Sequence, residues 1–226
     1  MALSVLTTAA IYSNSNLNNL LMYKTPLRIL ATIFCLATLS VQAQDSPEAK
    51  TLFGKGNGIN TKKLGFNVAP SIGYTRFDGS DAALFHLRGG VNFSDRLTLG
   101  AYYSVSLNNV APQSEPIPNI YLDYWSFGFL AEPTLFAKKL VHVTLPITLG
   151  YGEVEMDSEQ LDVDLGESNF FQGEVALMLE ANLIKNLRFN VGAGYRQLGS
   201  MSYRNMNQND LSGPTLYIGL RAGLFR

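Results

Sequence analysis

The chain has 226 residues, of which 46% are hydrophobic, 11% aromatic and only 15% charged, and its formal net charge is −1. This length is enough for one domain. A near-neutral chain lacks the basic surface that nucleic-acid-binding proteins present, so no nucleic-acid partner is expected.

A secretory signal precedes the predicted fold. Lys24 and Arg28 are followed by an uncharged apolar run at 29–41, and 41–43 reads Val-Gln-Ala, the form of a signal-peptidase site. This order of a basic, an apolar and a small-residue region is typical of a cleavable signal peptide, which we place at 22–43. A buried core helix is the alternative for the apolar run.

The residues around this signal are also set apart from the fold. We expect Met22 to be the true start, so that 1–43 is a mis-assigned start plus the signal peptide. The polar segment 44–64 is predicted to be a periplasmic linker, and 65–226 the folded domain. Cys35 lies in the signal, so the mature chain would have no thiol for a disulfide, a metal site or catalysis.

The stretch 168–199 alternates apolar or small residues with mostly polar ones. The apolar or small set is Phe171, Gly173, Val175, Leu177, Leu179, Ala181, Leu187, Phe189, Val191, Ala193 and Tyr195. A period of two predicts two strands, each with one apolar face, and the turn at 184–186 makes them an antiparallel hairpin. Ordinary strands have about 5–6 residues, whereas a tilted strand that crosses a bilayer needs about 9–11.

The same pattern recurs along the chain and predicts eight strands. They lie at 65–77, 82–93, 96–107, 119–136, 140–152, the two within 168–199, and 213–225. The connections near Ser94, Lys138 and Lys185 are short, and most of the others are long. Bacterial outer-membrane barrels have short periplasmic turns and long extracellular loops. The sequence therefore predicts an all-β, eight-stranded antiparallel up-and-down transmembrane β-barrel, with both termini in the periplasm.

Two features favour a membrane barrel over a soluble lipocalin-like or streptavidin-like barrel, which is apolar inside. Aromatic residues gather near strand ends, as in interfacial girdles: Phe66, Phe93, Tyr121, Trp125, Tyr151 and Tyr195. The polar face carries the charged residues Arg88, Glu132, Glu174, Glu180, Arg188, Arg196 and Arg221. These would be costly against lipid but can pair in a narrow lumen. We expect a lumen charge network, with Glu174 opposite Arg196 and Glu180 one step from Arg188.

A signal peptide, a linker, eight amphipathic strands and an end at Phe225-Arg226 resemble the small OmpA/OmpX-like outer-membrane β-barrel proteins. The resemblance covers about 65–226. Members of that family usually end in an aromatic residue, and here Arg226 follows Phe225. The resemblance implies the Gram-negative outer membrane as location. It also implies that outer-membrane lipid and lipopolysaccharide surround the barrel and that the barrel assembly machinery inserts it. It implies no cofactor.

The favoured function is a non-catalytic structural or surface-interaction role. An extracellular ligand would bind at the loops 108–118, 153–167 and 199–212, since loops on a rigid scaffold carry recognition. A small passive channel is one alternative, although side chains roughly fill an eight-stranded barrel.

A lipid A-modifying barrel enzyme is a further alternative. Its catalytic base would be His86 or His142, the two histidines of the chain. His142 has Thr144, not a serine, on the same face. We therefore predict no enzymatic activity.

The loop 153–167 carries seven acids and no base. Asp157, Asp162 and Asp164 offer the hard oxygen ligands that Ca²⁺ prefers, but their spacing does not match an EF-hand. A solvated acidic loop is the alternative, and we assign no metal site.

Overall fold

The computed structural model describes residues 64–93, 95–158 and 165–225. The predicted signal peptide, the start at Met22 and nearly all of the linker 44–64 lie outside these ranges. Nine strands form one sheet: β1 (Leu64–Phe77), β2 (Ser80–Phe93), β3 (Leu97–Ser106), β4 (Ile120–Leu135), β5 (Val141–Thr144), β6 (Ile147–Ser158), β7 (Glu167–Ile184), β8 (Leu187–Leu198) and β11 (Gly213–Gly223).

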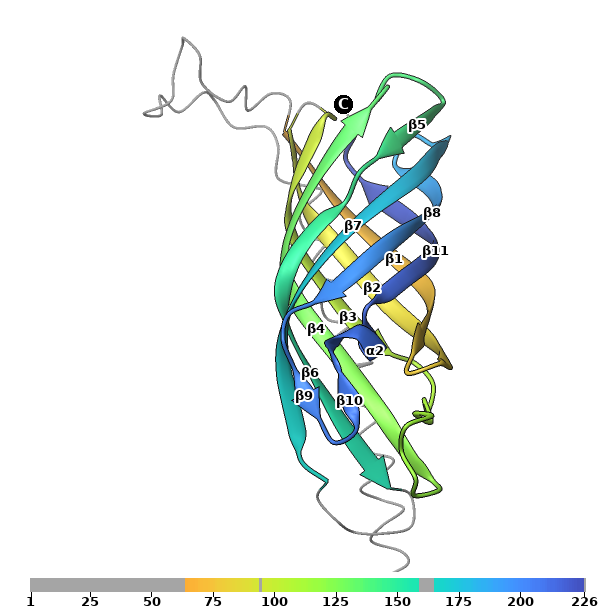
Figure 1. Cartoon of the computed structure of the whole chain (residues 1–226). Coiled ribbons are helices and arrows are strands. Elements are labelled where there is room, and N and C mark those ends of the chain that lie inside the picture. The colour runs from red at the N-terminus through yellow and green to blue at the C-terminus, as the bar shows by residue number, and fades with distance from the viewer. Residues whose placement is uncertain (1–63, 94, 159–164, 226) are drawn as a thin grey trace, which may run out of the picture. The chain divides into compact units, whose positions relative to one another are not determined.

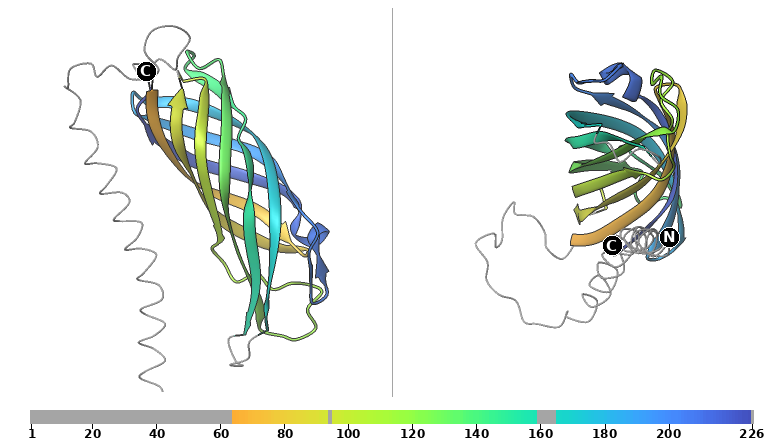
Figure 2. Two further views of the ribbon diagram at one scale, coloured as in Figure 1. Left: turned by 90° about the vertical axis from the view of Figure 1, so that its left-hand side faces the viewer. Right: turned by 90° about the horizontal axis from the view of Figure 1, so that it is seen from below.

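The sheet closes on itself as an eight-stranded barrel (Figures 1 and 2). Each strand pairs antiparallel with the next in sequence, and β1 pairs with β11 to complete the ring. β5 and β6 act as one strand, because both pair with β4 and with β7. They are separated at Pro146, which has no N–H to give to a ladder. The predicted fold class is confirmed.

The two faces of the wall differ as the alternation predicts. Large apolar side chains point outward and are exposed, among them Phe129 at 80%, Phe171 at 74% and Leu149 at 64%. The inward positions bury asparagine, serine, threonine, histidine and charged side chains. A barrel that is apolar outside and polar inside has the opposite arrangement to a lipocalin, so the soluble alternative is wrong.

No helix within 64–93, 95–158 and 165–225 is long and apolar enough to cross a membrane.

The turns fix the register of the strands. Between β1 and β2, Asp78 and Gly79 both have positive φ, 45° and 75°, which gives a tight two-residue hairpin turn. Between β7 and β8 the sequence predicts a three-residue turn, and this is wrong. Ile184 pairs with Leu187 across a two-residue turn, and a bulge after Asn182 restores the phase. Beyond the bulge, the predicted opposition of Glu174 with Arg196 is confirmed, and Glu180 lies opposite Asn190, one step along the same face from Arg188.

The long connections gather at one end of the barrel, here called the cap end, together with the tight β1–β2 turn, and the other short turns lie at the opposite end, the turn end (Figure 1). At the cap end β9 (Ser202–Tyr203) pairs with β10 (Met206–Asn207), and the one-turn helix α2 (Gln208–Leu211) follows. The polar loop predicted at 199–212 is therefore in part folded.

The loop predicted at 153–167 also begins later than expected. β6 continues to Ser158, which pairs with Ile120 at the start of β4. This extension carries β4 and β6 beyond the end of β8 at Leu198. Asp157 lies in it, whereas Asp162 and Asp164 are outside the described residues, so the ion-site hypothesis is not tested. Within the described ranges, no three histidine, cysteine, aspartate or glutamate side chains are placed to hold a metal.

Candidate functional site

The barrel interior brings together the seven charged residues that the sequence places on the polar face. All point inward, and none is more than 7% exposed. Five of them form one cluster toward the turn end, namely Arg88, Glu132, Glu180, Arg188 and Arg221. They come from five different strands, so closing the barrel is what assembles the cluster.

Two carboxylates hold this cluster together. Glu132 pairs with Arg221, and its second oxygen lies 3.5 Å from Nη1 of Arg88. Glu180 lies 3.0 Å from Nε of Arg221, and its other oxygen lies 3.8 Å from Nη1 of Arg188. Arg221 is therefore shared by both carboxylates. Each ion has a counter-ion, which a buried charge needs to be tolerated.

His142 and Phe225 complete the turn end of the interior. His142 Nε2 lies 3.1 Å from Oε2 of Glu180 and 3.2 Å from Nη1 of Arg188. The guanidinium carbon of Arg188 lies 3.4 Å from the centre of the Phe225 ring, a cation–π contact. The penultimate aromatic residue thus points into the lumen and packs on the charge cluster, so this end is filled by side chains.

Glu174 and Arg196 do not join this cluster. They are opposite in register, but the described structure has no ion pair between them. Glu174 accepts a hydrogen bond from the Tyr217 hydroxyl. Arg196 donates to the carbonyl of Leu211 at 2.9 and 3.1 Å, and it packs over the ring of Phe77 at 4.6 Å. The expectation that these two residues pair differs from the structure because α2 supplies Arg196 with a carbonyl acceptor.

The middle of the lumen holds a histidine and a serine that could suggest catalysis. His86 Nε2 lies 3.1 Å from Oγ of Ser104 and 3.4 Å from the Tyr217 hydroxyl. Both are buried, and the cavity beside His86 and Arg88 has a volume of about 10 Å³. That is room for roughly one water. His142 and Thr144 are likewise at most 1% exposed, so a substrate has no space at either histidine in the described structure.

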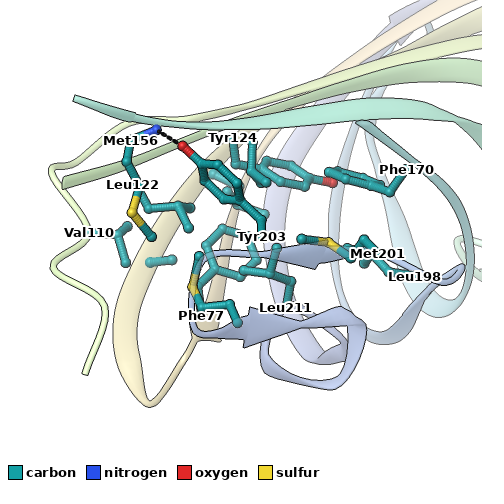
Figure 3. Close-up of a cluster of buried hydrophobic side chains, with 14 of the residues drawn as sticks. Phe77, Val110, Leu122, Tyr124, Met156, Phe170, Leu198, Met201, Tyr203 and Leu211 are labelled. Atoms are coloured by element: carbon teal, nitrogen blue, oxygen red, sulfur yellow. Dashed lines mark hydrogen bonds between the residues drawn. The ribbon is translucent and has the colours of Figure 1, made fainter. Parts of the chain in front are cut away.

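Toward the cap end, an apolar core replaces the polar interior (Figure 3). It is formed by Phe77, Ala82, Leu84, Val110, Ile120, Leu122, Tyr124, Val154, Met156, Phe170, Leu198, Met201, Tyr203, Met206 and Leu211. Inward residues of the barrel strands contribute most of this core, Val110 comes from the β3–β4 connection, and the remaining four residues come from the segment 199–212. This core closes the cap end of the lumen.

One hydroxyl fastens the segment 199–212 to the strands. Tyr203 accepts a hydrogen bond from the backbone N–H of Met156 at 3.1 Å, as Figure 3 shows, and its hydroxyl donates toward the adjacent carbonyls of Leu165 and Gly166. At the rim, Arg204 forms a two-pronged ion pair with Glu115, at 2.7 and 3.2 Å. The segment 199–212, together with the β3–β4 connection that it contacts, is here called the cap.

Sequence reasoning missed the buried residues of the cap. Met201, Tyr203, Met206 and Leu211 are spaced by two, three and five residues. This spacing matches neither the period of a strand nor that of a helix, so no periodic signal marks them. The residue types were a clue, because four large apolar side chains in the eleven residues 201–211 are too many for a solvated loop.

No protein-family model matches this sequence, and no curated protein matches it. Among solved structures, Neisserial surface protein A (NspA) aligns with a TM-score of 0.54 at 16% identity, over 71% of this chain and 96% of that one. The outer membrane protein OprG from Pseudomonas aeruginosa gives a TM-score of 0.45 at 11% identity, over 73% and 97%. The outer membrane enzyme PagL gives 0.36 at 13% identity, over 71% and 99%. The likeness to NspA shows that the chain has the fold of a small outer-membrane β-barrel.

Proposed function

We propose that this chain is a non-catalytic integral outer-membrane protein whose closed barrel displays the ordered cap at the cell surface. The observation that carries the proposal is the filled interior. The charge cluster and Phe225 occupy the turn end, and the apolar core occupies the cap end. A solute has no continuous path through such an interior, which argues against a passive channel.

The orientation follows from the two ends of the barrel. Short turns with exposed Lys138, Lys139 and Lys185 lie at the turn end, and the cap with its longer connections lies at the other. Barrels of this class place short turns in the periplasm and long loops outside. The cap would then carry the surface interaction, while lipid and lipopolysaccharide surround the wall and the barrel assembly machinery inserts it.

Paired proteases on intact cells test this orientation. The protease Glu-C, which cuts after glutamate, should cleave within 153–167, whereas trypsin should leave Lys138 and Lys185 intact until the outer membrane is permeabilised. The protein should also pellet with outer membranes and resist carbonate extraction. Recovery as a soluble periplasmic monomer, or tryptic cleavage at Lys138 in sealed cells, would contradict the proposal.

Two functional assays separate the alternatives. In a planar bilayer the wild-type protein should give little steady conductance, and a large stable pore would favour the channel. Purified outer membranes containing the protein should release no fatty acid, and steady release that is lost in His86→Ala would favour the enzyme.

A further inference from the structure

A groove interrupts the outer wall between β6, β7 and β8. Leu149 and Phe171 form one side, Gln197 the other, and Gly173 and Gly199 leave the space between them open. The groove has a volume of about 350 Å³, at the lower end of ligand sites, and it opens toward the surroundings of the barrel. It lies in the exposed apolar face, where Leu149 and Phe171 are 64% and 74% exposed.

The barrel does not need glycine at these two positions. An added Cβ at Gly173 would come no closer than 3.2 Å to any atom, a flexible methyl of Leu149, and one at Gly199 no closer than 3.4 Å. The inward Gly128 and Gly150 are different, because a Cβ there would lie 2.2 and 2.1 Å from a backbone carbonyl oxygen of the neighbouring strand. The inward glycines are required by close approach of the strands, whereas the outward pair only creates the groove.

The surface above the groove changes from aromatic to acidic toward the cap end. In register, the row of Leu149 and Gly173 is followed by Tyr151 with Phe171, and then by Glu153 with Asn169. Consecutive outward rows are about 7 Å apart. The acids Asp123, Glu153, Glu155, Asp157 and Glu167 lie on this surface, and the strand segments that carry them, 120–125, 153–158 and 167–171, contain no lysine or arginine.

We propose that this wall binds one lipid molecule with a primary ammonium head group, its acyl chain in the groove and its ammonium at Glu153 and Glu167. The inference rests on the membrane location proposed above. The groove is continuous with the face that meets hydrocarbon, and an apolar hollow there is filled by an acyl chain without desolvating polar groups. The acids select the head, because an ammonium donates charge-assisted hydrogen bonds to carboxylates, whereas a purely anionic head is repelled.

Brominated lipids test the site directly, because bromine quenches a nearby indole. The chain has one tryptophan, Trp125, so Trp125→Phe/Leu149→Trp places a single reporter at the groove. Its matched control is Trp125→Phe/Leu87→Trp, since Leu87 lies on β2, on the opposite side of the ring. Each is reconstituted in phosphatidylcholine bilayers with a small fraction of acyl-brominated phosphatidylethanolamine, or with brominated phosphatidylcholine, which carries the same charge but has no N–H.

At the groove, relative affinity for the ethanolamine lipid should exceed that for the choline lipid by roughly two- to five-fold, the range of an exposed ion contact. The Leu87→Trp reporter should show no preference. Gly173→Leu should abolish quenching selectivity by filling the groove, and Glu153→Gln/Glu167→Gln should remove the preference while acyl contact remains.

Equal quenching by both lipids at the groove, or selectivity that survives Gly173→Leu, would overturn the inference. The acids could instead bind a divalent cation that bridges them to an anionic lipid. In that case the groove reporter would prefer anionic lipid when calcium is present, and this result would also overturn the inference. Folding is checked in every variant by the mobility difference between heated and unheated samples. If the lipid-binding inference is wrong, the proposed outer-membrane location is not affected, because cell fractionation tests that location separately.

Discussion

The two halves of the barrel interior are filled in opposite ways. Toward the turn end, Glu132, Glu180 and Arg221 form a buried ion cluster whose members all sit on transmembrane strands. Toward the cap end, the space is filled by an apolar core that includes Tyr203 of β9 and Leu211 of α2, neither of which belongs to a barrel strand. The charged half depends on complete pairing, and the apolar half depends on packing.

This difference predicts different responses to mutation. A buried charge that loses its partner is left uncompensated in a low-dielectric interior, so the penalty exceeds the net worth of the pair. An apolar side chain that is shortened leaves a cavity, and its penalty depends on how far the neighbours can collapse. The charged half is part of the closed ladder and should unfold with the barrel. The cap contacts the barrel strands through side-chain packing and hydrogen bonds, but β9 and β10 form a separate small sheet, so we expect it to open locally.

The largest effect is expected for Glu132→Leu. Arg221 and Arg88 would both lose a carboxylate at a site that is 0% exposed. The free energy of unfolding should fall by about 3–5 kcal/mol. Urea unfolding of protein refolded in liposomes, followed by Trp125 fluorescence, measures it.

The controls for this substitution separate charge from shape. Glu132→Gln keeps the shape and a hydrogen-bond acceptor and should lose less. Adding Arg221→Leu to Glu132→Leu should recover part of the loss. A negligible loss in Glu132→Leu would mean that the cluster is bathed in open water.

Shortening the cap core should have a comparable but local effect. Leu211→Ala removes a fully buried side chain, and comparable core truncations cost about 2–5 kcal/mol. We expect hydrogen exchange in β9, β10 and α2 to accelerate while the urea midpoint of the barrel stays within error. Lys138→Ala, at an exposed short turn, is the control and should change neither. A shift of the whole-barrel midpoint would show that the cap and the barrel are one cooperative unit.

Removing a single hydroxyl sharpens the same comparison. Tyr203→Phe keeps the ring in the core but removes the hydroxyl that accepts from the Met156 N–H and donates toward the Leu165 and Gly166 carbonyls. A buried group left unsatisfied costs about 1–3 kcal/mol. Faster exchange of the Met156 amide in mass spectrometry of that peptide is the readout. Tyr195→Phe, on the outer face, should leave that amide unchanged, and equal rates in all three proteins would assign no role to the Tyr203 hydroxyl.

The same division explains what sequence reasoning could reach. The strands, their inward and outward faces, and the burial of residues such as Arg88 and Arg221 follow from a period of two, which each strand carries by itself. The partner of Arg196 does not follow, because it is the Leu211 carbonyl of a one-turn helix with no periodic signal. The ion cluster could be predicted only in part. Strand register predicts which residues are neighbours on adjacent strands, but it does not predict contacts across the lumen, such as that of Arg221 with Glu132.

The smallest predicted effect concerns the extension of β4 and β6 beyond the apolar band. Asp123, Glu155 and Glu167 are opposite one another in register, and like charges in facing positions destabilise a strand pair. Burial raises the pKa of Glu155, and the nearby Asp123 and Asp157 raise it further. A carboxyl whose pKa is raised on folding binds its proton more tightly in the folded state. It therefore destabilises the fold at neutral pH, and the penalty disappears as the pH falls below that pKa.

Glu155→Gln should accordingly stabilise this extension by about 0.2–1 kcal/mol near neutral pH and by less near pH 4, because a larger fraction of the wild-type Glu155 carboxyl is then protonated. Trp125 lies at the base of the extension, so its fluorescence during urea titration at both pH values reports the change. Glu115→Gln is the matched control, and we expect it to change stability in the opposite direction. Glu115 is already paired with Arg204, and removing its charge should destabilise the cap rather than relieve repulsion. If Glu155→Gln and Glu115→Gln shift stability in the same direction at neutral pH, repulsion between the facing acids does not weaken the extension. The acidic surface above the groove would then impose no energetic cost on the fold.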